Sequence, residues 1–412
     1  MVHTYELSIP ILMLLWVSEF SISIGSLAVV VSAGYAMFGL GALPSGVLSD
    51  IYGSRTLIVC CLVGMGASFL LLSVAPSLPV LVLALVCWGV AASVYHPAGL
   101  ALISTGTVDR GSAFAYHGMA GNAGIALGPL ATALLLLVVD WRFVTMLLSI
   151  PALFVALYAL TVRFNETAGT NERQADTDSS DTTSATSLSE LWIGSKALFA
   201  TGFSIVFVIV MLNGLFYRGA LTLLPEILTT LLEPAVGDIQ VFNPDSPMAA
   251  EFEPSRYFYT GLLMVGIGGQ YVGGKLTERI PTERGLMAVF GSLAVTALAF
   301  VPAARANIVL LALVSAVLGF LLFMIQPLYQ ATIAQYSPAN ARGLSYGFTY
   351  VGTFGIGALG AAITGIIYDG FGTFAMFMTL AGFALLASLL SYSLLASGYT
   401  GASPDAVKTG DD

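Results

Sequence analysis

The sequence predicts an all-α polytopic membrane protein with twelve transmembrane helices in two pseudo-symmetric six-helix halves. Of its 412 residues, 57% are hydrophobic and only 9% are charged, whereas soluble domains carry roughly 25% charged residues. Apolar runs long enough to cross a bilayer recur along most of the chain. A polar, glycine-marked turn at 46–55 recurs at 274–284, which indicates a tandem repeat.

Further pairs of residues support the repeat. His96-Pro97 recurs as Gln326-Pro327, and Arg110-Gly111 recurs as Arg342-Gly343. Large parallel repeats of apolar helices build one class of membrane transporters, whose substrate site lies between the two repeats. We therefore expect a substrate site between the halves.

The first half comprises residues 1–163. Its apolar runs predict helices at 5–17, 24–48, 56–75, 79–104, 112–138 and 143–163. The first run is shorter than the roughly 20 residues that a spanning helix needs. Residues 164–196 are rich in Ser, Thr and Asp and predict a disordered linker.

The second half comprises residues 197–397, and a polar tail follows at 398–412. Its seventh helix runs to about 232, and the remaining helices are predicted at 256–275, 285–303, 307–335, 343–366 and 374–397. An acidic loop at 233–256 joins the first two of these helices. This loop is either a lid or a solvated insertion, because surface loops tolerate insertions at low entropic cost.

The distribution of basic residues predicts the orientation. With both termini in the cytoplasm, ten basic residues lie inside and three lie outside, as the positive-inside rule requires. We expect a multi-pass protein of the cell membrane, and a monomer. The net charge of −9 disfavours nucleic acid as a partner. The three cysteines lie in apolar runs without metal-ligand spacing, so no metal or cofactor is expected.

The turn at 46–55 resembles the signature loop of the major facilitator superfamily (MFS), which joins helices 2 and 3. The matching residues are Gly46, Leu48, Asp50, Gly53 and Arg55. The second copy keeps Gly274, Leu276, Glu278 and Arg279. The resemblance implies the MFS fold and a cytoplasmic gate. In this gate Asp50 faces the start of helix 11 near Arg342, and Glu278 faces Arg110.

A second resemblance concerns one branch of the superfamily. Residues 95–98, 215–219 and the glycine-rich run 347–360 are similar to the fosmidomycin-resistance-like branch, which implies drug export coupled to proton entry. Gly121, Gly124, Gly128 and Pro129 partly match the antiporter motif of exporters, although tight helix packing explains small residues equally well. Exporters often carry an arginine in helix 4 where this chain has Leu85.

Polar residues at membrane depth are the candidate site residues, because each is costly there unless it faces a cavity or a partner. The substrate-binding candidates are Arg218, His96, Asn122, Asn213, Gln326 and Gln330. Arg218 offers a permanently charged fork of donors that suits an anion. Its side chain either faces the cavity or extends toward the membrane surface.

Three residues are candidates for proton coupling. Glu6 is the acidic residue of the first apolar run, and His96 and His117 can change charge near neutral pH. Pro97 frees a backbone carbonyl one turn earlier, so it and His96 could form a proton-sensitive kink.

These observations predict a secondary active transporter that works by alternating access. Proton-coupled export of an amphipathic or anionic compound is the first interpretation, and proton-coupled uptake of an organic anion or a sugar is the alternative. A receptor with a transporter fold is a third. The chain shows no metalloprotease, nucleophile-elbow or phosphate-loop motif, so an enzyme is not expected.

Overall fold

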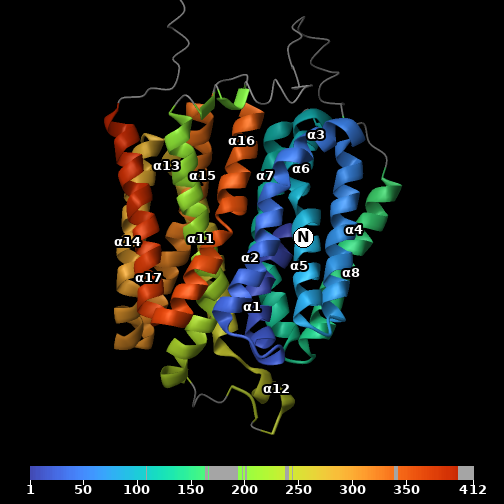
Figure 1. The fold of residues 1–412 in the computed structure, drawn as a ribbon, viewed down its shortest axis with the longest axis vertical. Helices are drawn as coiled ribbons and strands as arrows, with labels where there is room; N and C mark the ends of the chain where they lie inside the picture. The colour runs from blue at the N-terminus through green and yellow to red at the C-terminus, as the bar shows by residue number, and fades with distance from the viewer. Residues whose placement is uncertain are drawn as a thin grey trace, which may run out of the picture.

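The computed structural model describes residues 1–107, 109–162, 166, 194–196, 198–199, 202–236, 241–243, 245–337 and 342–397. Every regular element in these ranges is a helix, and the long helices form one bundle (Figure 1). The fold is that of an all-α membrane protein, as predicted. The predicted tail at 398–412 and the predicted linker lie outside the described residues, apart from Glu166 and residues 194–196.

Two predicted helices of the first half are interrupted in the structure. The helix expected at 24–48 is divided at Gly41, and the helix expected at 79–104 is divided at Val94. The described helices are α1 (Val2–Glu19), α2 (Ile24–Leu40), α3 (Ala42–Tyr52), α4 (Ser54–Ser73), α5 (Leu78–Ser93), α6 (Tyr95–Gly106), α7 (Arg110–Leu135) and α8 (Trp141–Thr161).

The second half contains a π-helical segment, and its last helix bends at Gly372, whose φ is 80°. This bend separates the last two predicted spans, since only glycine readily adopts a positive φ. The described elements are α11 (Phe203–Val236), α12 (Pro247–Glu251), α13 (Pro254–Thr277), α14 (Thr282–Ala306), α15 (Ile308–Tyr336), α16 (Arg342–Tyr350), η2 (Val351–Ile356) and α17 (Leu359–Ala396).

Within the described ranges, nine helical stretches are long and apolar enough to cross a membrane. One of them, Leu344–Ala396, has 53 residues, which is enough for two spans of roughly 20 residues each. α1 has 18 residues, more than the run at 5–17 suggested, and it extends to both sides of that run. With each interrupted pair of helices counted as one span, the arrangement is consistent with twelve.

The two halves lie side by side, with the first half in blue to green and the second in yellow-green to red (Figure 1). Across their boundary, α1 packs against α11, α2 against η2 and α17, and α7 against α13. The backbones approach closely on the α2 side, because a Cβ at Gly39 would lie only 1.9 Å from the amide nitrogen of Gly355. Small residues therefore let the halves meet without intervening side chains.

An aspartate joins the halves at the end of the molecule that carries α12. Both carboxylate oxygens of Asp369 accept from the Gly25 N–H, at 3.1 and 3.2 Å. Gly25 lies in the first turn of α2, where backbone N–H groups lack helical partners and the helix dipole favours an anion. The second half thus caps a helix of the first half.

The Asp369 contact predicts how a substitution changes the separation of the halves. Asp369→Asn should raise the thiol reactivity of a cysteine at Ala28, which is buried beside Gly365 in the same seam. We expect an increase of about two- to fivefold, because a carboxylate at a helix N-terminus is worth roughly 0.3–1 kcal/mol. Labelling with an impermeant maleimide measures it.

Asp140→Asn is the matched control. Asp140 caps α8 within the first half by accepting from the N–H groups of Arg142 and Phe143. An equal increase in reactivity in this control, or no increase in Asp369→Asn, would contradict the role of Asp369 as a contact between halves.

Candidate functional site

A cavity of about 340 Å³ lies between the two halves. Helices α1, α6 and α7 supply one side, which we call the N-half wall. Helices α11, α13, α15 and α16 with η2 supply the other side, the C-half wall. This volume falls within the usual range for small-molecule sites.

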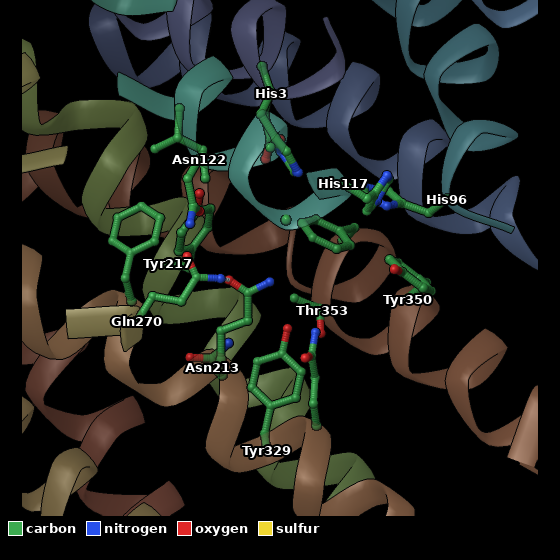
Figure 2. Close-up of a pocket in the computed structure, with 18 of the residues that line it drawn as sticks. His3, His96, His117, Asn122, Asn213, Tyr217, Gln270, Tyr329, Tyr350 and Thr353 are labelled. Atoms are coloured by element: carbon green, nitrogen blue, oxygen red, sulfur yellow. Dashed lines mark hydrogen bonds and ion pairs between the residues drawn. The ribbon is translucent and has the colours of Figure 1, made fainter. Parts of the chain in front are cut away.

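The two walls differ in chemistry. The N-half wall carries His3, His96 and His117 together with Glu6 and Asn122. The C-half wall carries amides, phenols and a hydroxyl, which belong to Asn213, Tyr217, Gln270, Gln326, Tyr329, Gln330, Tyr350 and Thr353. Figure 2 shows Asn213, Tyr329 and Thr353 on the opposite side of the cavity from His3. The lining side chains whose ordinary pKa values lie nearest pH 7, the three histidines, are therefore all on the N-half wall.

The structure gathers at this cavity all but one of the substrate-binding and proton-coupling candidates. Those that line it are Glu6, His96, His117, Asn122, Asn213, Gln326 and Gln330. The exception is Arg218, which lies behind Glu6. Among the described residues, no group of three or more His, Cys, Asp or Glu side chains is placed to hold a metal ion.

Arg218 and Glu6 form an ion pair between the halves. The Arg218 Nη2 atom lies 2.6 Å from Glu6 Oε1, and their side chains are 2% and 1% exposed. Arg218 belongs to α11 of the second half, and Glu6 belongs to α1 of the first. Neither charge meets solvent, so each depends on the other for neutralisation.

Rings surround the guanidinium of Arg218. Its Cζ atom lies 3.9 Å from the centroid of Tyr35, 5.3 Å from Phe354 and 5.5 Å from Tyr217. The Tyr35 hydroxyl donates to the Glu6 backbone carbonyl at 3.0 Å. These cation–π contacts hold the charge in place where water is excluded. In these surroundings the Arg218 side chain does not face the cavity directly. It also does not extend toward a membrane surface.

The other oxygen of Glu6 contacts a histidine that the sequence analysis did not select. Glu6 Oε2 lies 2.7 Å from His3 Nδ1, one turn earlier on α1. The His3 side chain is 23% exposed, whereas that of Glu6 is 1% exposed. His3 therefore stands between the carboxylate and the cavity.

His96 lies at the interruption between α5 and α6, and its ring reaches the other half. It stacks on Tyr350 with 5.2 Å between ring centroids and 23° between planes. The Nε2 atom of His96 is buried without a hydrogen-bond partner in the described part of the chain. A break beside Pro97 fits the predicted kink, but α15 continues through Pro327, so the repeat does not reproduce it.

The glycine motif of α7 positions α1. A Cβ at Gly128 would lie 2.6 Å from the Thr4 Cα atom, and the Thr132 hydroxyl donates to Ser8 at 2.8 Å. Gly124 likewise faces Thr4. Close packing along this motif thus fixes the helix that carries His3 and Glu6.

Sequence reasoning also missed Tyr350, Thr353 and the other tyrosines of the C-half wall. Tyrosine is common at membrane interfaces, so its presence in an apolar run gave no signal. His3 was missed because it precedes the run at 5–17. Its spacing of three residues from Glu6 was the available signal, since such residues share a helix face.

The first predicted gate turn holds neighbouring helices together. The φ of Gly53 is 80°, and the N–H groups of Ser54 and Arg55 donate to Glu166 at 2.9 and 3.3 Å. The Arg55 guanidinium donates to the carbonyls of Ala159 and Leu160 near the end of α8. Gly53 thus forms the turn between α3 and α4, and the start of α4 is tied to α8, whereas Gly46 lies inside α3, so the predicted turn at 46–55 is confined to its last residues.

The remaining gate predictions are only partly described. α3 packs against α16, as expected for the turn that carries Asp50. Glu278 lies 3.6 Å from Lys275 on its own helix, near Gly274 and Arg279. The side chains of Asp50, Arg110 and Arg342 lie outside the described residues, so the predicted charge contacts stay a prediction.

The comparison with known families gives a match over nearly the whole chain. The family model described as Major Facilitator Superfamily matches residues 2–361 and, overlapping them, 257–409. A curated relative, the puromycin resistance protein pur8 of Streptomyces alboniger, is 37% identical over 117 residues. This match covers 28% of the present chain and 23% of the relative, so it spans less than a quarter of the relative's length.

Solved structures share the fold at low sequence identity. A bacterial homologue of the human lysosomal transporter Spinster, in an inward-facing and unoccupied conformation, gives a TM-score of 0.73 at 14% identity, covering 98% of this chain and 97% of that one. A mutant of the nucleoside transporter NupG gives 0.69 at 15% identity, covering 96% and 97%. The human organic anion transporter MFSD10 gives 0.57 at 18% identity, covering 88% and 83%.

A double-mutant cycle measures the energy of the buried pair. Arg218→Gln should destabilise the protein by about 3–5 kcal/mol, because it leaves the Glu6 carboxylate buried without its counter-ion. Adding Glu6→Gln should restore part of that loss, with a coupling energy above roughly 1 kcal/mol. Denaturant unfolding in detergent micelles measures both quantities.

The exposed pair Arg142–Glu19 provides the control. Its atoms are 2.8 Å apart, but its side chains are 36% and 39% exposed, so the same cycle should give less than about 1 kcal/mol. Additive effects of the two Glu6 and Arg218 substitutions would show that the ion pair contributes no energetic coupling.

Proposed function

Because the chain belongs to the major facilitator superfamily, we propose that it is a proton-coupled exporter of an amphipathic small molecule that works by alternating access. We place it in the cell membrane with the α3 end in the cytoplasm, as the distribution of basic residues indicates. The lipid bilayer and the small molecule are its partners. No step calls for a cofactor.

The observation that carries the proposal is the Glu6–Arg218 ion pair. Secondary transport needs a side chain that binds the coupling ion. Binding and release of that ion must change the relative position of the two halves. Glu6 lines the cavity and contacts Arg218 of the opposite half at 2.6 Å. Proton binding at Glu6 removes the negative charge that neutralises Arg218, so it weakens the contact between α1 and α11.

The proposed cycle follows from this contact. When Glu6 is ionised, the ion pair holds α1 and α11 together, and the protein binds substrate from the cytoplasm and carries it to the outward-open state. There Glu6 takes a proton from outside, which leaves the guanidinium without its counter-ion, weakens the contact between the halves and favours release of the substrate. The protonated, empty protein returns to the inward-open state, where loss of the proton to the cytoplasm restores the pair, so one cycle exchanges a proton for a substrate molecule.

The Glu6–Arg218 ion pair also limits the charge of the substrate that fits the cavity. Arg218 is occupied by Glu6 and does not line the cavity, so an anion would find no free guanidinium in this state. The rings and amides of the walls suit an amphipathic compound better. The partial likeness to a puromycin resistance protein supports export as the direction.

Transport with a charge-neutral variant tests the proton coupling. In proteoliposomes, Glu6→Gln should lose puromycin accumulation driven by a pH gradient but keep exchange of puromycin across the membrane. Exchange needs only the binding and reorientation of loaded protein, whereas accumulation also needs a titrating group. We expect a loss of tenfold or more in accumulation, in line with roughly 1.4 kcal/mol of coupling energy.

Glu19→Gln is the control, because Glu19 lies on the same helix in an exposed pair away from the cavity. This variant should accumulate puromycin like the parent protein. Gradient-driven accumulation by Glu6→Gln at the parent rate would remove Glu6 from the coupling. Accumulation of puromycin on the alkaline side of the membrane would favour uptake over export, because substrate would then move in the same direction as the proton.

A further inference from the structure

Three amide side chains line the cavity without hydrogen-bonding to the described part of the protein. Within the described part of the chain, the side chains of Asn122, Asn213 and Gln330 make no hydrogen bond, although all three line the cavity. Asn213 is 6% exposed, Asn122 is half-buried and Gln330 is exposed. Their donors and acceptors are not used by the protein, so they are open to a molecule that enters the cavity.

Other polar atoms of the walls are unpaired as well. Gln270 donates to Gln326 Oε1 at 3.1 Å, but its own Oε1 atom is buried without a partner. The Thr353 hydroxyl is in the same state, and its side chain belongs to a residue that is 4% exposed. His96 Nε2 is unpaired in the same way, and all three residues, Gln270, Thr353 and His96, line the cavity (Figure 2).

The charge of the cavity excludes ionic ligands as the best fit. Among its described lining residues, Glu6 is the only acidic one and none is Lys or Arg. Arg218 neutralises Glu6 from behind the wall. A charged ligand would therefore lose its hydration without gaining a counter-ion.

Aromatic rings supply flat surfaces beside these amides. His96, Tyr350 and Phe354 form a stacked series, with centroid distances of 5.2 and 5.7 Å and interplanar angles of 23° and 19°. Phe114 and Phe323 also line the cavity. Such faces stack on planar ring systems, which a saturated sugar ring does not provide.

Carboxamides match one kind of planar ring best. Each presents an N–H donor and a C=O acceptor side by side in one plane. This arrangement pairs with a heteroaromatic edge that carries an adjacent acceptor and donor, as Asn and Gln do with adenine. A flat ring that stacks on an aromatic side chain and hydrogen-bonds to an amide through its edge would use both the rings and the amides of the cavity.

We propose that the cavity binds an uncharged planar heteroaromatic compound through its ring edge, and that nucleosides are the simplest members of this class. The inference rests on the proposed function, because it names the substrate class of the same site. Asn213 and Gln330 of the C-half wall hold the ring edge, and the aromatic side chains that line the cavity support the ring face.

Equilibrium binding tests the proposal. The probes are radiolabelled adenosine and uridine, bound to the full-length protein in lipid nanodiscs without a pH gradient. We expect saturable binding of at least one nucleoside, with no displacement by excess glucose or benzoate. Asn213→Leu and Gln330→Met should each weaken this binding by roughly tenfold or more.

Asn243→Leu is the matched control, because Asn243 is an exposed amide between α11 and α12. It should bind like the parent protein. Thermal unfolding of each variant separates lost binding from lost folding, and the two amide substitutions on different helices check each other. Absence of saturable binding of both nucleosides, displacement by glucose or benzoate, or parent-like binding by both amide variants overturns the proposal.

The two proposals fail separately. Binding that depends on the amides, combined with no pH-driven transport, contradicts proton-coupled export but supports the ligand class. Proton-driven export of an amphipathic compound that has no purine or pyrimidine ring, by a protein that binds neither nucleoside, contradicts the ligand class alone.

Discussion

A charge held away from water needs an opposite charge nearby, and in this protein the two partners belong to different halves. Arg218 of α11 and Glu6 of α1 neutralise each other at 2.6 Å. The halves therefore cannot move apart at this point without separating charges or changing the protonation of Glu6. This constraint links an electrostatic event at the cavity wall to the relative position of the two halves.

The packing around the pair makes the constraint effective. Glycines of α7 let α1 approach closely, and Gly214 of α11 meets the backbone of Thr353 in η2, where a Cβ would lie 2.2 Å from the Thr353 carbonyl oxygen. Helices fixed in this way cannot rotate to relieve a lost charge locally. At the α12 end, Asp369 adds a second polar contact between the halves. The pair and the aspartate thus act on the same boundary at different depths.

The sequence predicted the fold class because hydropathy and the repeated turn reflect the bilayer and the pseudo-symmetry directly. It also selected most polar residues of the cavity, since a polar side chain at membrane depth needs a reason to be there. It did not predict that Arg218 pairs with Glu6, because that contact depends on how α1 and α11 are rotated about their axes. Tyr350 was missed for a related reason: η2 and α16 place it against His96 through local backbone geometry that periodicity does not reveal.

The central claim is that protonation of Glu6 changes the relative position of the halves. It is tested most directly by the distance between spin labels at Tyr52 of α3 and at Glu278, which directly follows α13; these residues are 61% and 66% exposed. The labels are placed in a background without Cys60, Cys61 and Cys87. Double electron–electron resonance at acidic and alkaline pH should show that the parent distribution shifts between short and long distances. In the Glu6→Gln variant the distribution should stay the same at both pH values. The account would be contradicted if the distance distribution of the parent protein did not change with pH, or if that of the variant shifted as the parent's does.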